Sequence, residues 1–297
     1  MPCYRPLVGY KCDQTGKLLF DYRPDLQYME VPCGGCIGCR LQYSKDWALR
    51  CYCEAQMHNQ NSFITLTYRE EDLPSDGSLV LEHFQNFMKR LRWHSGEKIR
   101  FFHCGEYGED LKRPHYHAIL FGYQFPDLEH FATNHQGQPL YRSKTAEKIW
   151  QKGWVTIGEA TWQSAAYVAR YIFKKQKGES ARDHYWTEPD EDGVITTLKP
   201  EYVTMSRRPG IGLSWLKKYW TDIYPKDYLT INGKKFAPPR YYDKWLKDHH
   251  PEIMEDVIIG RIENAERHAQ DFTDERLRDR EYVQQKNVND KLLRNKV

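Results

Sequence analysis

RPHYHAILFG, residues 113–122, is the stretch of this sequence from which the fold can be worked out. Its aromatic and aliphatic residues end at a glycine, so we predict a strand over residues 115–122. His115 and His117 stand two residues apart, and alternate side chains of a strand project from the same face. The stretch therefore predicts a strand, otherwise apolar, that presents two imidazoles together.

Strand and helix patterns alternate on both sides of these histidines. The predicted strands are residues 62–68, 99–105, 115–122 and 154–158, and the predicted helices are residues 80–93, 145–152 and 163–175. The order β-α-β-β-α-β-α is typical of a ferredoxin-like α+β fold, an antiparallel sheet with helices packed on it. Further on we expect a polar loop over residues 176–200, a helix over 213–224 and a hairpin turn at Asn232-Gly233.

The composition limits the class of protein. Of its 297 residues, 40% are hydrophobic, and the mean hydropathy of −0.83 is typical of a soluble protein. We find no apolar run near the roughly 20 residues of a membrane span and no signal-peptide core at the start. We therefore expect a cytoplasmic protein whose 8 cysteines are free thiols or metal ligands. The net charge of +3 is weak evidence for a nucleic-acid partner.

A carboxylate is expected beside the two histidines. If residues 99–106 and 115–122 form a hairpin, Glu106 returns to the neighbourhood of His115. Two imidazoles and one carboxylate suit a divalent ion that keeps open positions for a phosphate. The alternatives are that Glu106 caps the turn or pairs with Arg113, and that the histidines are ordinary strand residues with hydrogen-bond partners.

Residues 166–175, AYVARYIFKK, place two tyrosines on one predicted helix. Tyr167 and Tyr171 are four residues apart and share a face of that helix. Arg170 and Lys174 each follow a tyrosine by three residues, and positive charge favours a phenolate and neutralises a phosphate under attack. The alternative is a pair of core tyrosines with solvated basic neighbours.

The spacing C-x-x-C-x-x-C of Cys33, Cys36 and Cys39 indicates a tetrahedral zinc site on a glycine-rich turn. Cys3 is our first choice as the fourth ligand, because it lies outside the cluster beside a proline. Its rivals are Cys12, Cys51 and Cys53. Buried free cysteines or an iron–sulfur cluster are the alternatives.

Some residues outside these motifs are candidates for contact with DNA. Arg207, Arg208 and Lys175 are the basic residues chosen for contacts with phosphates, although most surface cations only interact with solvent. Trp154 and Trp162 are candidates for stacking on bases, with core packing as the alternative for at least one of them.

Taken together, H-x-H followed by Y-x-x-x-Y resembles the HUH endonuclease superfamily, in the motif order of rolling-circle initiators. Tyr116 fits the hydrophobic middle position of the histidine motif loosely. FITLTY, residues 63–68, resembles the first strand motif of that family, and GEYG, residues 105–108, resembles the segment that supplies its third metal ligand. Residues 1–6, 31–40 and 205–212 are similar to replication initiators of gokushoviruses, small bacteriophages with single-stranded DNA.

The resemblance implies a function and a set of cofactors. It implies a tyrosine endonuclease that nicks single-stranded DNA at an origin, forms a 5′-phosphotyrosine and rejoins strands to release circles. Mg²⁺ or Mn²⁺ would be held by His115, His117 and Glu106, beside a structural Zn²⁺. Host helicase and DNA polymerase would be partners in the cytoplasm of the bacterial host, since the chain has no Walker-type phosphate motif. The alternatives are a non-catalytic, zinc-stabilised single-stranded DNA-binding protein and an HUH-type transposase.

These assignments divide the chain into three regions. Residues 1–60 are a Cys-rich segment that we expect to be irregular, and residues 61–225 are the predicted HUH nuclease domain. Residues 226–297 are predicted to be helical, charged and partly flexible, because charges of both signs are mixed past Pro251.

Overall fold

The protein forms two compact units in a computed structural model that describes residues 3–12, 14–108, 111–134, 137–174, 185–186 and 197–294. The terminal unit comprises Met1–Tyr43, Pro225–Asp227 and Lys244–Val297. The sheet unit comprises Ser44–Tyr224 and Tyr228–Asp243. Most of the loop expected over residues 176–200 lies outside the described residues.

An antiparallel sheet organises the sheet unit, with seven strands among the described residues in the order β10-β5-β6-β4-β9-β8-β7. The strands are β4 (Asn61–Tyr68), β5 (Arg100–Tyr107), β6 (Pro114–Phe121), β7 (Glu129–Thr133), β8 (Pro139–Arg142), β9 (Gly153–Glu159) and β10 (Tyr202–Met205). The helices are α1 (Ile37–Ala55), which begins in the terminal unit, α2 (Leu81–Ser95), α3 (Lys144–Trp150), α4 (Trp162–Lys174) and α6 (Leu213–Ile223), with a short η1 (Glu70–Asp72). The α+β class and the antiparallel sheet are confirmed.

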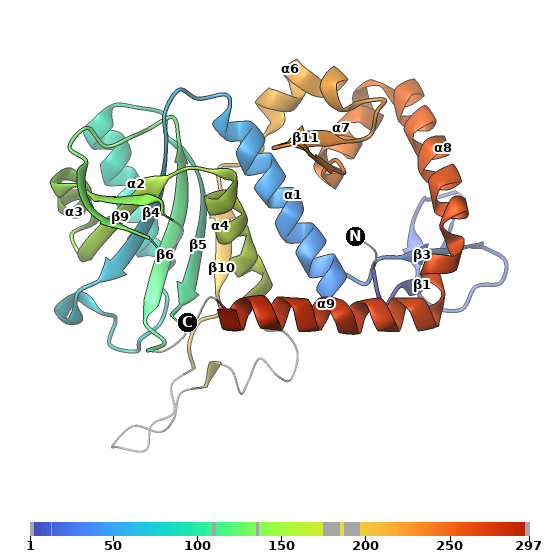
Figure 1. Ribbon diagram of the computed structural model, residues 1–297, viewed down its shortest axis with the longest axis horizontal. Helices are drawn as coiled ribbons and strands as arrows, with labels where there is room; N and C mark the ends of the chain where they lie inside the picture. The colour runs from blue at the N-terminus through green and yellow to red at the C-terminus, as the bar shows by residue number, and fades with distance from the viewer. Residues whose placement is uncertain are drawn as a thin grey trace. The chain divides into compact units, whose positions relative to one another are not determined.

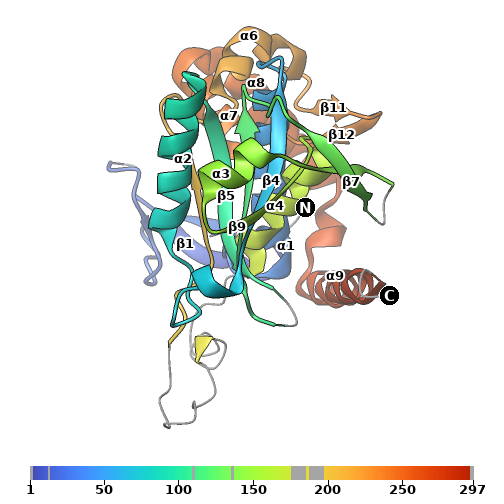
Figure 2. The same cartoon turned by 90° about the vertical axis from the view of Figure 1, so that its left-hand side faces the viewer.

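Helices cover both faces of this sheet. On one face, α2 and α3 lie in front of the sheet in Figure 2. They contribute Phe84, Phe87 and Trp150 to the hydrophobic core. On the other face, α4 contributes Val168 and the second part of α1 contributes Cys51 (Figure 1). Burial alternates strictly along β4, so each of its residues belongs to one face or the other.

The middle residue of the histidine motif, Tyr116, belongs to the face under α2. Its side chain is fully buried, and its hydroxyl accepts a hydrogen bond from the backbone N–H of Val80 at 2.8 Å. Val80 is the N-cap residue of α2 and supplies no side-chain cap of its own. The hydroxyl of Tyr68 lies 2.8 Å from that of Tyr116. The Tyr116 hydroxyl therefore accepts a backbone N–H at the start of α2, where the side chain of an N-cap residue usually supplies the acceptor.

The terminal unit contains a small sheet and two long helices. Its strands β1 (Leu7–Lys11), β2 (Leu18–Leu19) and β3 (Gln27–Val31) pair antiparallel in the order β2-β1-β3. Its helices are α8 (Pro251–Arg267) and α9 (Asp274–Arg294), joined through η2 (Ala269–Phe272). No helix in the described part of the chain is both long and apolar enough to cross a membrane.

The prediction that residues 1–60 are irregular is wrong, because they contain β1–β3 and the 19-residue helix α1. Most buried positions of α1 are small, polar or charged and give no strong hydrophobic period; they are Gly38, Ser44, Ala48, Leu49, Cys51, Cys53 and Glu54. The predicted hairpin is present as β11 (Leu229–Ile231) and β12 (Lys234–Phe236), which is followed by α7 (Arg240–His249).

Replacement of Tyr116 by phenylalanine tests its role at the start of α2. We expect Tyr116→Phe to lower the free energy of unfolding by about 1–2 kcal/mol, because it leaves the Val80 N–H without its acceptor. Urea denaturation followed by circular dichroism measures this change. The control is Tyr22→Phe, whose side chain is 76% exposed and whose stability should be unchanged. Equal stability of both variants would contradict this role for the hydroxyl.

Candidate functional site

The site begins with the pairing of β5 and β6, which aligns Glu106 with His115 and Cys104 with His117. Glu106 and His117 project from the same face, and Oε1 of Glu106 lies 2.7 Å from Nε2 of His117. Each of these two residues is 5% exposed. Arg113, the alternative partner of Glu106, forms its ion pair with Glu70 instead. The structure thus brings the carboxylate to the histidines, as the hairpin implies.

Both histidines are held through their Nδ1 atoms. His115 Nδ1 lies 2.8 Å from the backbone oxygen of Arg113, and His117 Nδ1 lies 2.9 Å from Oγ1 of Thr65. Such contacts orient metal-binding histidines and leave Nε2 as the ligand atom. Burial, as the largest effect, lowers the pKa of His115 and favours the neutral imidazole that a metal requires.

The donor set fits a divalent ion in its chemistry, with two imidazoles and one carboxylate on one face. The spacing of the three ligand side chains fits such an ion less closely. Within the described residues, only four cysteines form a group of three or more ligand atoms lying within 4.8 Å of one another. An ion bound by all three residues would therefore draw His115 inward and replace the 2.7 Å contact between His117 and Glu106.

A tyrosine of α4 packs directly on this site. The ring of Tyr167 meets the imidazole of His117 edge to face, with centroids 5.2 Å apart and planes at 88°. Phe63 stacks on the same imidazole at 5.9 Å and contacts Tyr167 at 6.0 Å. The backbone of Arg170, Tyr171 and Lys174 belongs to α4, while their side chains and all of Lys175 lie outside the described residues.

Four cysteine thiols gather in the terminal unit. They belong to Cys3, Cys33, Cys36 and Cys39, and their sulfur atoms lie within 4.8 Å of one another. Four backbone N–H groups donate to three of these sulfurs, at 3.3 Å from Tyr4, 3.3 Å from Cys33, 3.2 Å from Cys36 and 3.5 Å from Cys39. The tetrad can therefore bind a metal such as zinc, for which thiolates are the preferred ligands.

The environment of Cys36 favours its thiolate. Burial disfavours the charged form, but the backbone N–H groups of Cys39 and Tyr4 donate to it, and its pKa is lowered to about 7. The rival ligands behave differently. Cys51 and Cys53 are buried in the sheet unit, where burial raises the pKa of each thiol, to about 12 for Cys53. Cys3 lies with Cys33, Cys36 and Cys39, whereas Cys51 and Cys53 do not belong to this group.

Comparison with known proteins shows the family. Residues 61–176 match the family model described as replication-associated protein ORF2/G2P. The chain is 34% identical over 265 residues to replication-associated protein VP4 of Bdellovibrio phage phiMH2K, covering 85% of this chain and 79% of that protein. This chain belongs to the phage replication-associated proteins. It is also 32% identical over 272 residues to replication-associated protein ORF2 of Spiroplasma virus 4, covering 83% and 81%. Replication-associated protein ORF4 of Chlamydia phage 1 is 32% identical over 225 residues, covering 73% and 53%. No solved structure matches the chain.

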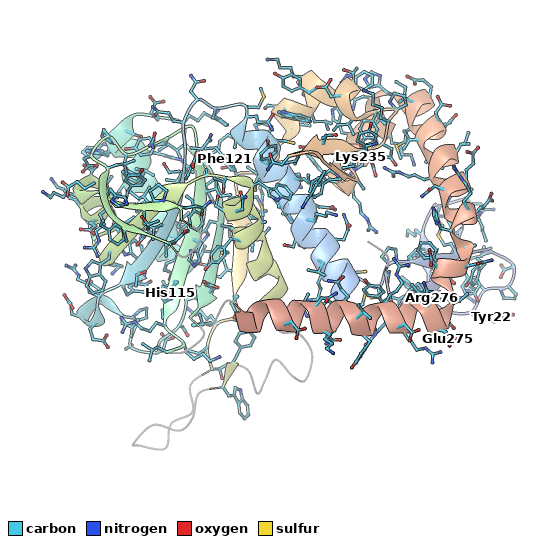
Figure 3. The ribbon with its side chains drawn as sticks, in the orientation of Figure 1. Tyr22, His115, Phe121, Lys235, Glu275 and Arg276 are labelled. Atoms are coloured by element: carbon cyan, nitrogen blue, oxygen red, sulfur yellow. The ribbon has the colours of Figure 1, made fainter. Side chains whose placement is uncertain are left out.

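The two arginines proposed for DNA contact lie away from the histidines of this replication-associated protein. Arg207 and Arg208 are exposed and lie just after the end of β10. Ser206, which precedes them, donates its backbone N–H to the backbone oxygen of Phe101, near the start of β5. Arg100 pairs with Phe121, at the opposite end of β6 from His115 (Figure 3). At about 3.3 Å per residue, the two ends are roughly 20 Å apart. These arginines therefore do not form part of the histidine site.

Sequence reasoning missed two residues of the site. Thr65 hydrogen-bonds to His117, and Phe63 stacks on its imidazole ring. Both residues belong to the strand motif at residues 63–68, but its resemblance to the family assigns no role to either of them. The alternation of β4 was the available signal, because it puts residues 63, 65 and 67 on one face. Of the two tryptophans, Trp154 is 49% exposed, whereas Trp162 packs on Tyr52 and Phe236.

Substitution of one cysteine of the tetrad tests its role in this replication-associated protein. We expect Cys36→Ser to lower the zinc content of the purified protein from about one ion per chain to well below that, and to lower the Tm by about 5 °C or more. Elemental analysis and thermal unfolding measure these effects. Cys12→Ser, outside the tetrad, should leave both unchanged. A folded wild-type protein without zinc would contradict the assignment.

Proposed function

We propose that this protein initiates rolling-circle replication of a single-stranded DNA phage by nicking the origin with a tyrosine, in the cytoplasm of the bacterial host. A role in replication follows from its family. The nicking mechanism rests chiefly on one observation, the packing of Tyr167 against His117 at 5.2 Å while His117 contacts Glu106. A nucleophile candidate and a metal-ligand candidate thus meet at one place on the sheet.

The strand order supports a ferredoxin-like HUH core. In the unit β4-α2-β5-β6-α3-β9 the order in the sheet is β5-β6-β4-β9, so the first strand lies between the third and the fourth. Such interleaving is a feature of split β-α-β folds, to which ferredoxin-like domains belong. We therefore assign the nuclease to residues 61–225, the zinc-binding segment to residues 1–60, and a charged helical region to residues 226–297.

Two metals have separate roles in this proposal. Zn²⁺ at Cys3, Cys33, Cys36 and Cys39 would be structural. Mg²⁺ or Mn²⁺ at His115, His117 and Glu106, when bound, would supply Lewis-acid polarisation of the scissile phosphate. The imidazoles favour Mn²⁺ somewhat.

The covalent step belongs to the tyrosines of α4. The hydroxyl oxygen of Tyr167 or Tyr171 attacks phosphorus, the bond from phosphorus to the 3′ oxygen breaks, and that oxygen takes up a proton as the phenol loses one. The products are a 5′-phosphotyrosine and a 3′-hydroxyl that a host polymerase extends. Arg170 and Lys174 would stabilise the charge of the phosphate, and a host helicase would unwind the duplex.

Joining reverses this chemistry. The 3′-hydroxyl attacks the phosphotyrosine, releases the tyrosine and closes a circle, while the second tyrosine cleaves the regenerated origin. Away from this chemistry, Arg207, Arg208 and Lys175 would contact DNA phosphates.

Removal of one histidine tests the metal-dependent step. We expect His117→Ala or His115→Ala to lower the nicking rate on a labelled origin oligonucleotide by at least about 100-fold, because each change removes one of three protein ligands. DNA binding should be largely retained, since phosphate contacts lie elsewhere. EDTA should mimic the variants and Mn²⁺ should restore the wild type.

The matched control is His94→Ala, at an exposed position of α2. Nicking that persists in EDTA would refute the metal assignment. Binding without any nicking by the wild-type protein would favour the alternative of a non-catalytic DNA-binding protein.

The tyrosine pair is tested by removing one hydroxyl at a time. If the two alternate, Tyr167→Phe and Tyr171→Phe should each still form a covalent DNA adduct, and only the double variant should lose it. The single variants should fail in circle release, because that step needs both hydroxyls. Denaturing gels quantify the adduct, and mass spectrometry identifies the residue that carries the nucleotide. A nucleotide found on a residue outside this pair would overturn the mechanism.

A further inference from the structure

The C-terminal helix α9 buries one narrow stripe of side chains. Leu277 is 4% exposed and Glu281 is 9% exposed, and no other residue among 274–288 and 290 is buried. These two are one helical turn apart, so they share a face. The start of the helix, marked by Glu275 and Arg276 in Figure 3, is exposed at both of these positions.

That stripe contacts the cysteine tetrad. Leu277 forms an apolar cluster with Tyr4 and Cys36, and the other three cysteines of the tetrad pack against this cluster. One turn further along, Glu281 Oε2 accepts a hydrogen bond from Nε of Arg5 at 2.8 Å. Arg5 follows Tyr4, whose N–H donates to the sulfur of Cys36 at 3.3 Å. Leu277 and Glu281 thus both contact the segment next to Cys3, through Tyr4 and Arg5 respectively.

The charges around the tetrad suit a metal-loaded site. One Zn²⁺ with four thiolates carries a net double negative charge, which is costly to bury unless cations lie close by. Arg5, two residues from Cys3 in the sequence, supplies such a cation, and its hydrogen bond to Glu281 joins it to α9.

The rest of α9 offers little to hold it in place. Its sequence from Asp274 to Arg294 is dominated by charged and amide side chains, whereas most of the stability of a helix in a protein comes from the packing of an apolar face. A local contact remains, in which Arg276 pairs with Asp271 at 3.2 Å in the preceding turn. Such an exposed pair contributes little. Where the structure describes burial, α9 therefore buries only Leu277, against the tetrad, and Glu281, which contacts Arg5.

We propose that α9 is the outer wall of the zinc site, where Leu277 and the Arg5–Glu281 pair close over the thiolates and couple metal retention to docking of the C-terminal helix. The proposal rests on the assignment of zinc to the tetrad. It adds that the two ends of the chain form one metal site. Thermodynamic linkage requires the coupling to be reciprocal, so loss of α9 contacts weakens zinc binding and loss of zinc releases α9.

The first experiment measures zinc release from the full-length protein with a chromogenic chelator. Leu277→Ala should release zinc at least about tenfold faster than the wild type, because it removes the apolar cover of the sulfurs. Glu281→Gln should show a smaller increase in rate. The matched control is Val283→Ala, on the same helix at a position that is 55% exposed, and its release rate should equal that of the wild type.

The second experiment measures the reverse effect. After removal of zinc by the chelator, or in Cys36→Ser, trypsin should cleave within α9 faster than in the loaded wild type, at sites identified by mass spectrometry. Far-UV circular dichroism serves as the check that Leu277→Ala remains folded.

The outcomes separate the two assignments. A wild-type protein without zinc refutes the metal site itself. If zinc is present, but Leu277→Ala releases it at the wild-type rate and zinc removal leaves trypsin cleavage of α9 unchanged, the coupling is refuted and the metal site stands. Neither result depends on whether the protein nicks DNA.

Discussion

The antiparallel pairing of β5 with β6 is the constraint on which the candidate site depends. Its register sets Glu106 opposite His115 and Cys104 opposite His117. Because side chains alternate along a strand, a shift of one residue would turn both imidazoles under α2 and bring Tyr116 to the other face. The apolar residues of β6 oppose such a shift, since Ala118 and Leu120 pack in the core beneath α2 and α3 while Ile119 and Phe121 pack on the opposite side.

The strands β4, β5, β6 and β9 and the helices α2, α3 and α4 were predictable because their sequence patterns are strong. The four residues at helical spacing in α2, Phe84, Phe87, Met88 and Leu91, are the ones that the helix buries. Burial alternates along the strand at residues 62–68, as expected of a strand with one face more deeply buried than the other. In these segments, local periodicity and tertiary burial agree, so sequence reasoning succeeds.

Other parts escaped sequence reasoning for physical reasons. The helix α1 buries one large aliphatic residue, Leu49, among small, polar and charged side chains and two cysteines, and sequence reasoning considered these cysteines only as metal ligands. The strand β7 is almost wholly exposed and has no apolar face to recognise. Contacts between distant segments, such as Thr65 with His117 or Arg5 with Glu281, depend on the fold and leave no periodic trace in the sequence.

The hydrogen bond between Thr65 and His117 determines which tautomers of the imidazole the site can accommodate. When His117 donates from Nε2 to Glu106, its Nδ1 needs a donor, and a hydroxyl can be that donor. When Nε2 instead binds a cation, Nδ1 carries the proton and the same hydroxyl can accept it. Rotation of one O–H bond therefore accommodates both tautomers, and the ring can keep its place against Phe63 and Tyr167 in either state. A valine at this position would have a similar shape but could serve neither tautomer.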